Sequence, residues 1–161
     1  MVENKVLDKI CSLYVNQMHL IVMLIPYIEK ELEKGNKIVT ILENDLRAEA
    51  ETLVNKVNLP KRKKKGLRAI NWNKTRLSYE DIESIREAVI LVDGSYEFIK
   101  DVNRILSDNN KKVINCFELG TFEENSREIL EGHCKILNTL GEKEISEVFH
   151  PNIVKSSILT K

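Results

Sequence analysis

Short apolar runs alternate along this chain with longer segments of helical periodicity, and this alternation constrains the fold more than any other feature. The runs that predict strands are Lys9–Tyr14, Lys37–Leu42, Leu67–Trp72, Ala88–Val92, Lys112–Leu119 and Cys134–Leu137. Nearly continuous apolar character is typical of strands that are covered on both faces. Strand–helix alternation then predicts right-handed βαβ units and a mostly parallel sheet. We expect an α/β fold in the form of a three-layer sandwich.

Several of the intervening helices carry signals for their ends. Apolar residues from Leu20 to Leu32 recur at helical spacing, and Gly35 suits the left-handed position after a helix. Pro26 lies inside this pattern and predicts either a kink or a first turn. The other expected helices are one capped by Asp45 and ending near Val57, Tyr79–Arg86 capped by Ser78, Tyr96–Leu106, and Phe122–Gly132 capped by Thr121.

Length and composition suit one domain spanning residues 1–161, with the tail after about Pro151 loosely attached. The 161 residues are 42% hydrophobic and 31% charged, enough for a core without metal or disulfide staples. Three cysteines without a CxxC pair argue against a secreted disulfide framework. No apolar run approaches the roughly 20 residues of a membrane span, and the N-terminus does not resemble a signal peptide. We expect a cytoplasmic protein without membrane association.

Charge is balanced overall, with 25 basic and 25 acidic residues, but it is unevenly distributed. No Asp or Glu occurs between Thr52 and Tyr79, a window with nine basic residues, so the rest of the chain has 16 basic and 25 acidic residues. One hypothesis is that residues 61–76 bind nucleic acid or an anionic nucleotide; the other is a solvated loop of mutually repelling cations. The candidate polyanion-binding residues are Lys61, Arg62, Lys63, Lys64, Lys65, Arg68, Lys74 and Arg76.

Polar residues follow the expected strands, where parallel sheets bind their ligands. These segments are 14–16, 43–45, 72–73, 93–95 and 118–120. Asp93 follows an apolar strand as the magnesium-binding acid of P-loop ATPases does, although an acid there more commonly caps a helix. Neither GxxxxGK[ST] nor GxGxxG occurs, so nothing is expected to hold a triphosphate. ATP hydrolysis is therefore not expected.

Other catalytic and metal signatures are also missing from the sequence. No GxSxG elbow or HxxxH pair occurs. One interpretation of Cys11, Cys116, His133 and Cys134 is a zinc site; the preferred interpretation is that the cysteines are buried as small apolar side chains. A general base at Asp93 or Glu118 is a third, weaker hypothesis. We expect no metal, no cofactor and no catalytic residue.

An ordered set of segments resembles the MEDS family of sensory domains, found in methanogens, methylotrophs and a dichloromethane-responsive regulator. The N-terminal part of the resemblance comprises Ile10–Tyr14, Ile25–Ile28 with its proline–aromatic pair, and Leu32–Leu42 with its glycine turn. The C-terminal part comprises Asn115–Glu118, Phe122 and Leu130–His133. The chain departs from the family at Asp8-Lys9, where the family often has a histidine, and in its Lys-rich middle.

The resemblance implies a RecA/KaiC-like fold that lacks the P-loop and has no enzymatic activity. The expected function is sensory or regulatory, in which a small ligand or a regulatory protein partner is recognised and the signal passes through protein–protein contact or a homo-oligomer. The candidate ligand-binding residues are Tyr14, Tyr27, Trp72, Asp93, Cys116 and His133. For each of them taken singly, core packing is the alternative interpretation.

Overall fold

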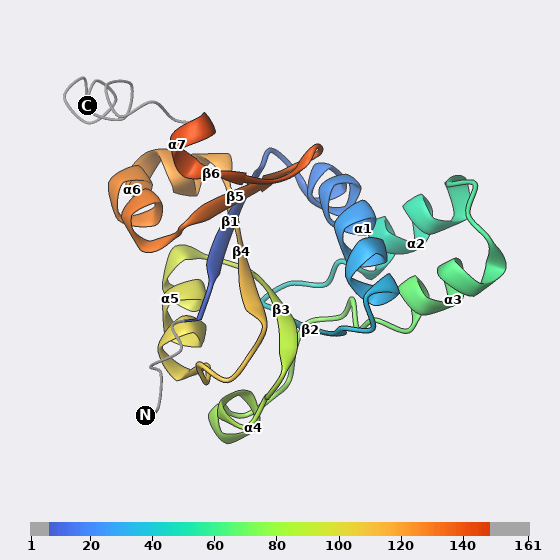
Figure 1. Ribbon diagram of the computed structural model, residues 1–161, viewed down its shortest axis with the longest axis horizontal. Helices are drawn as coiled ribbons and strands as arrows, with labels where there is room; N and C mark the ends of the chain where they lie inside the picture. Colours follow the sequence, from blue (N-terminus) through green and yellow to red (C-terminus); the bar gives the residue numbers. More distant parts are fainter. Residues whose placement is uncertain (1–6, 149–161) are drawn as a thin grey trace.

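A six-stranded sheet forms the middle layer of the structure, a computed structural model that describes residues 7–148 (Figure 1). Its strands are β1 Lys9–Tyr14, β2 Lys37–Leu42, β3 Ala88–Asp93, β4 Lys112–Glu118, β5 Lys135–Asn138 and β6 Gly141–Glu144. Their order across the sheet is β2-β3-β4-β1-β5-β6. All pairs are parallel except β5–β6. The predicted three-layer α/β sandwich with a mostly parallel sheet is confirmed.

Helices cover both faces of this sheet. The helices are α1 Gln17–Glu33, α2 Arg47–Lys56, α3 Lys61–Arg68, α4 Tyr79–Glu83, α5 Tyr96–Ile105, α6 Leu119–Gly132 and α7 Ile145–Val148. Helices α1, α2 and α3 lie on one side, and α5 and α6 lie on the other (Figure 1). No helix between residues 7 and 148 is both long enough and apolar enough to cross a membrane.

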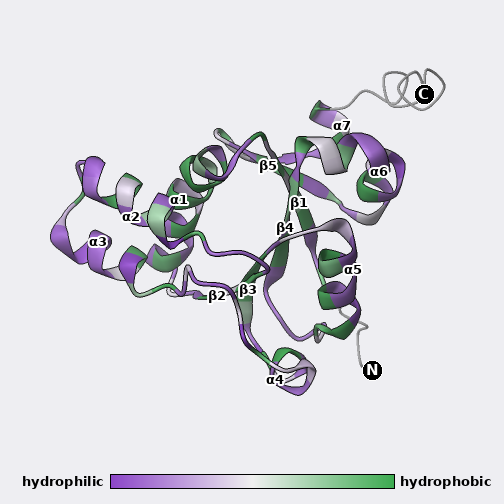
Figure 2. Cartoon of the chain, turned by 180° about the vertical axis from the view of Figure 1, so that it is seen from behind, coloured by the Kyte–Doolittle hydropathy of each residue, from purple (hydrophilic) through white to green (hydrophobic). Residues whose placement is uncertain are grey.

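Alternation along each strand divides the core into two layers. In β3, Val89 and Leu91 face α1 and α2, whereas Ile90 and Val92 face α5. All six residues of β3 are buried, as expected for a strand in the middle of a parallel sheet. Figure 2 shows the sheet largely in the green of hydrophobic residues and α3 largely in purple. Burial in the core therefore explains the apolar runs of the sequence, whereas α3 is largely hydrophilic and has Leu67 as its buried residue.

The element predictions are confirmed for β1, β2, β3 and β4 and, with small shifts in their ends, for β5, α1, α4 and α5. Ser78 forms the predicted capping box with Asp81. Gly35 has a φ of 81°, as the end of α1 requires. Pro26 lies inside α1, so the first-turn alternative is wrong. The predicted loose tail after Pro151 lies outside the described residues.

The predicted strand Leu67–Trp72 is wrong. Leu67 belongs to the last turns of α3, and the chain from Ala69 onward forms an irregular segment beside β2. The apolar side chains of Leu67, Ile70 and Trp72 pack into the core layer under α1 and α2. These residues are apolar because they are buried against helices. A short apolar run has the same appearance in the sequence whether it forms a strand or another buried segment.

Two capping predictions are also wrong, and two elements besides α3 were not expected. Helix α2 begins after Leu46 without a side-chain cap, because Asp45 instead accepts a hydrogen bond from the Lys74 N–H. Helix α6 begins at Leu119, ahead of Thr121. These two elements are β6 and α7, and the positive φ of Gly141, 109°, marks the turn into β6.

Candidate functional site

A cleft of about 640 Å³ opens at the carboxyl ends of β1, β3 and β4. The chain leaves β1 toward the face covered by α1 but leaves the neighbouring β4 toward the face covered by α6. Such a divergence between adjacent strands creates the crevice in which open α/β sheets bind ligands. The residues lining the cleft are Tyr14, Val15, Asn16, Gln17, Met18, Asn44, Glu49, Asp93 and Glu118.

A hydrogen bond between Tyr14 and Asp93 forms the floor of the cleft. The Tyr14 hydroxyl donates to Asp93 Oδ1 at 2.6 Å, and both residues are buried. Burial raises the pKa of Asp93 to about 6, and the nearby carboxylates of Glu43 and Glu118 act in the same direction. Burial likewise raises the pKa of the Tyr14 hydroxyl. The hydroxyl thus engages the carboxylate that resembled a magnesium ligand in the sequence.

The connection from β1 to α1 cannot form a phosphate cradle, because it comprises only two residues, Val15 and Asn16. Asn16 Oδ1 caps α1 by accepting from the His19 N–H at 2.9 Å. The Val15 N–H donates to His19 Nδ1 at 3.0 Å. Two of the backbone amides that would face a phosphate are therefore engaged locally, which agrees with the missing P-loop motif.

The polar side chains lining the cleft are carboxylates, amides and the Tyr14 hydroxyl. Glu49, Asp93 and Glu118 contribute the acids, and no Lys, Arg or His is among the lining residues. Glu43 lies just behind them and accepts a hydrogen bond from the Ser95 N–H at 2.7 Å. Such a lining suits groups that donate hydrogen bonds and disfavours phosphate. Among residues 7–148, no group of three or more His, Cys, Asp or Glu side chains is placed to hold a metal ion.

The structure brings together three of the six predicted ligand-binding residues. Tyr14 and Asp93 are in contact, and Cys116 lies beside Asp93 in the register of β3 and β4, fully buried on the same sheet face. Burial raises the pKa of the Cys116 thiol well above its ordinary value, so the thiol is not poised for nucleophilic chemistry. Cys116 is not among the residues that line the cleft.

The other three predicted residues lie apart from the cleft. Tyr27 lies on α1 with the Lys112 ammonium 5.1 Å from its ring centre. Trp72 is buried under α1 and α2, where its indole N–H donates to the Leu67 carbonyl at 2.9 Å. His133 follows α6 on the opposite face of the sheet. For these residues the single-pocket prediction is not supported by the geometry.

Glu49 is the cleft residue that sequence reasoning missed. It lies in the first turn of α2, so it is not at a strand end, and only the packing of α2 against the sheet brings it to the cleft. An acid near a helix start is ordinarily explained by the helix dipole, and so it gives no functional signal. Asn16, Asn44 and Glu118, by contrast, were among the polar residues expected at the strand ends.

His133 takes part in a polar network on the α5–α6 side of the sheet. Its Nδ1 lies 2.6 Å from the Ile129 carbonyl, and its Nε2 lies 2.9 Å from Asn115 Nδ2. Asn115 and Asn103 exchange two hydrogen bonds, at 2.8 and 3.0 Å. These contacts are all satisfied when His133 is neutral with its proton on Nδ1. Burial lowers the pKa of His133, and the charge of Lys9 adds to this effect.

Acidification is expected to destabilise the fold through His133. Because the pKa of His133 is lower in the folded state, the unfolded chain binds more protons as pH falls below about 6.5, and stability decreases from there down to the folded pKa. Asp93 acts in the opposite direction, since its folded pKa is raised. Urea unfolding between about pH 7 and pH 5 should therefore show a shallower loss of stability for His133→Gln than for the unsubstituted protein. An identical pH profile for both would contradict the assignment.

The Lys-rich segment predicted as a solvated loop is a helix, α3, docked on α1. Lys63 Nζ lies 2.6 Å from Glu29 Oε1 and 2.8 Å from Glu33 Oε1, both on α1. Lysine is a good helix former, and Leu67 anchors the helix in the core. Lys63 therefore holds two helices together and is committed to that contact. Lys61, Arg62 and Lys65 are exposed, and Arg68 donates to the Asn55 side chain.

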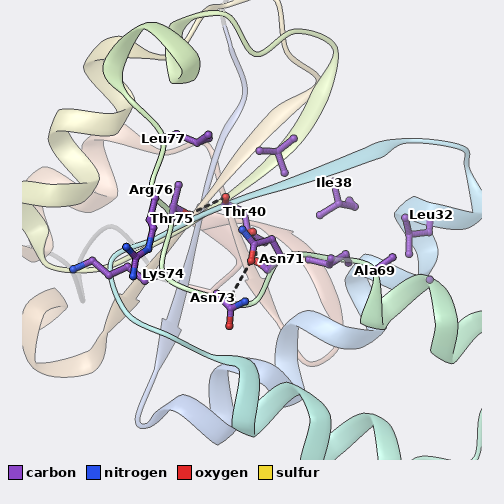
Figure 3. Close-up of a pocket in the computed structure, with 13 residues that line it drawn as sticks. Leu32, Ile38, Thr40, Ala69, Asn71, Asn73, Lys74, Thr75, Arg76 and Leu77 are labelled. Atoms are coloured by element: carbon purple, nitrogen blue, oxygen red, sulfur yellow. Dashed lines mark hydrogen bonds between the residues drawn. The ribbon is translucent and has the colours of Figure 1, made fainter.

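A second hollow, a groove of about 730 Å³, runs along the outer edge of β2 (Figure 3). The segment 69–77 crosses this edge, where Thr75 exchanges hydrogen bonds with Leu42. Lys74 and Arg76 are the charged residues lining the groove, and it contains no acid. The eight predicted polyanion-binding residues thus divide between this groove and α3, with Lys63 engaged elsewhere.

No family model, no curated protein and no solved structure matches the chain.

Proposed function

We propose that the protein is a non-catalytic sensory or regulatory domain that recognises a ligand in the carboxyl-end cleft. The ligand is a small molecule, or a group presented by a signalling partner, that donates hydrogen bonds to the carboxylates. The observation that carries the proposal is the Tyr14–Asp93 hydrogen bond at 2.6 Å on the floor of a 640 Å³ cleft. In this hydrogen bond the Tyr14 hydroxyl engages Asp93, which lies where a P-loop ATPase has its magnesium-binding acid.

Three further features support this proposal. The two-residue connection from β1 to α1 leaves no phosphate loop. The cleft lies where open α/β sheets bind ligands. The resemblance to the MEDS family, which implies a RecA/KaiC-like fold without a P-loop, agrees with both features. A degenerate RecA/KaiC-like origin is therefore part of the proposal.

The proposed mechanism is a shift between two populations of the cleft. A ligand that donates to Asp93 competes with the Tyr14 hydroxyl for the same carboxylate and favours an arrangement in which that hydrogen bond is broken. Tyr14 immediately precedes Val15 and Asn16, which lead into α1. A change at Tyr14 can therefore alter the start of α1, where Val15, in the connection, and Met18, in the first turn, are exposed and offer a surface to a partner.

Binding of nucleic acid through residues 61–76 remains a second hypothesis, which the geometry favours less. Lys63 is held by two glutamates, and Trp72, which lies within the segment, is buried rather than free to stack on bases, so that the exposed aromatic residue closest in sequence is Tyr79, beyond the segment. The remaining cations lie both on α3 and beside β2. Steep weakening of oligonucleotide binding with salt would be its signature.

The test is a small-molecule fragment screen read by ¹H–¹⁵N correlation spectra. Fragments that bind should shift the amide signals of Val15, Asn16, Asn44 and Glu118 and should lose affinity in Asn44→Ala and Glu118→Gln. Asn58→Ala and Glu83→Gln serve as matched controls, because both residues are exposed and lie outside the cleft. Binding confined to other surfaces would reject the cleft as the site. Phosphate release from Mg·ATP, abolished in Asp93→Asn, would reject the non-catalytic assignment.

A further inference from the structure

We propose that the open edge of β2 is a docking site for an extended, acidic segment of a partner protein, which adds to the sheet as a further strand. The site is the groove beside β2, distinct from the carboxyl-end cleft, and the inference does not depend on the proposed sensory function. It rests on three properties of the groove: unpaired backbone groups, positive charge and apolar side chains placed on both sides of the edge.

The first property is a strand edge that is only partly covered. β2 is the outermost strand and pairs with β3 on one side alone. The Glu43 N–H points toward β3, where it donates to the Asp93 carbonyl. Because backbone groups alternate in direction along a strand, the N–H and C=O groups of Leu42, Thr40 and Ile38 point outward, away from β3. Thr75 confirms this direction, since its N–H donates to the Leu42 carbonyl and its hydroxyl to the Thr40 carbonyl.

The segment 69–77 covers the edge from Thr40 onward, because Thr40 is buried and its hydroxyl donates to the Asn71 carbonyl, and it leaves the edge open at Ile38. Within residues 7–148, no hydrogen bond is found for the outward N–H and C=O of Ile38 or for the outward N–H of Thr40. Ile38 lines the groove and is half-buried (Figure 3). A residue that presents both its N–H and its C=O at a sheet edge offers the pair of hydrogen bonds that an added strand uses.

The second property is the positive charge of the groove lining. Lys74 and Arg76 line the groove and are exposed, and Lys37, at the start of β2, is exposed beside it. None of the lining residues is acidic. Complementarity therefore favours a segment that carries Asp or Glu. A second copy of this chain pairing through the same edge would bring these cations together, which disfavours a homodimer at this surface.

The third property is apolar surface placed for alternate side chains. Ile38 and Leu32 lie on the α1 side of the β2 edge, and Val39 and Leu77 lie toward the other side (Figure 3). Successive side chains of an added strand point to opposite faces of the sheet and would meet these two apolar surfaces in turn. The occupant that fits is an extended segment in which β-branched residues accompany acids. An oligonucleotide would bind the cations through its phosphates and would leave the backbone N–H and C=O groups of the β2 edge unpaired.

The probe is a fluorescent peptide that alternates Val and Glu, with binding followed by polarisation. Affinity should fall at least about tenfold in the double variant Lys74→Glu, Arg76→Glu and remain unchanged in the control Lys100→Glu, Lys111→Glu, whose residues are exposed and outside the groove. All four positions are exposed, and a urea midpoint for each variant verifies that it folds. A peptide that alternates Val and Lys should not bind.

Backbone pairing is tested separately with two N-methylated versions of the same peptide. In both peptides every second amide is methylated. The first peptide lacks the N–H groups that would face β2, and the second lacks the N–H groups that would face solvent. One version should lose binding and the other keep it, and hydrogen exchange should slow at the amides of Ile38 and Thr40. Equal binding of both versions would overturn strand addition. Displacement of the peptide by oligo(dT) of higher affinity, or dimerisation through β2 without peptide, would overturn the assigned occupant.

Discussion

Replacing Lys112 by methionine is expected to lower the free energy of unfolding by about 3–5 kcal/mol, because the buried carboxylate of Glu31 loses its closest counter-ion and keeps only the exposed Lys34 at 3.6 Å. Lys112 Nζ lies 2.8 Å from Glu31 Oε1 and 3.1 Å from Glu142 Oε2. The side chain of Glu31 is only 1% exposed. Burial alone would raise the pKa of Glu31, but the hydrogen bonds from Lys112 and Asn36 outweigh it and leave the pKa lowered.

Urea unfolding at neutral pH measures this loss, with Lys111→Met as the matched control. Lys111 is the preceding residue, and its side chain is exposed. Its substitution should change stability by less than about 0.5 kcal/mol. Adding Glu31→Gln to Lys112→Met should recover part of the loss, since the fully buried carboxylate is then removed. A Lys112→Met variant as stable as Lys111→Met would show that the ion pair linking α1, β4 and β6 contributes little.

Replacing Trp72 by alanine is expected to cost about 3–5 kcal/mol, through the cavity that it leaves. Trp72 is 1% exposed in the core layer under α1 and α2. Its side chain donates to the Leu67 carbonyl at 2.9 Å, and its own carbonyl accepts from the Leu46 N–H at 2.7 Å. The residue thus attaches the segment after α3 to the start of α2.

The same unfolding measurement separates packing from hydrogen bonding at this position. Trp72→Phe retains much of the ring but loses the indole N–H, so it should cost less than Trp72→Ala, although the Leu67 carbonyl is left without this donor. Tyr79→Ala is the control, because this aromatic residue is 68% exposed and should change stability little. Loss of equal size for Trp72→Ala and Tyr79→Ala would mean that Trp72 is not part of the core.

Local patterns in the chain predicted the framework of the fold and one part of the site. β-Branched apolar runs identified β1 to β4, because burial on both faces of a parallel sheet demands such runs. The position of Asp93 directly after one of these runs placed it at a carboxyl end, where the cleft is found. The sequence lacks a P-loop motif, and in the structure the connection between β1 and α1 has only two residues, too few for a phosphate-binding loop.

Contacts between distant residues decided the rest. A run of like charges predicts a solvated loop, yet α3 packs on α1 because Glu29 and Glu33, about thirty residues earlier, neutralise Lys63. His133 was grouped with Tyr14, but the return of the chain through α6 places it on the opposite face of the sheet. Glu49 joins the cleft only because α2 packs on α1 in the core layer on that face of the sheet.

The sequence by itself determined most of the strands and helices of the sandwich and which strand ends carry polar groups. Periodicity encodes this information, since each residue's burial repeats with the local geometry of the backbone. Only the tertiary structure decided which polar groups meet, which cations are already paired and which strand has an open edge. Those properties depend on the order of strands across the sheet and on the face that each helix covers. The spacing of apolar and polar residues along the chain encodes neither of these.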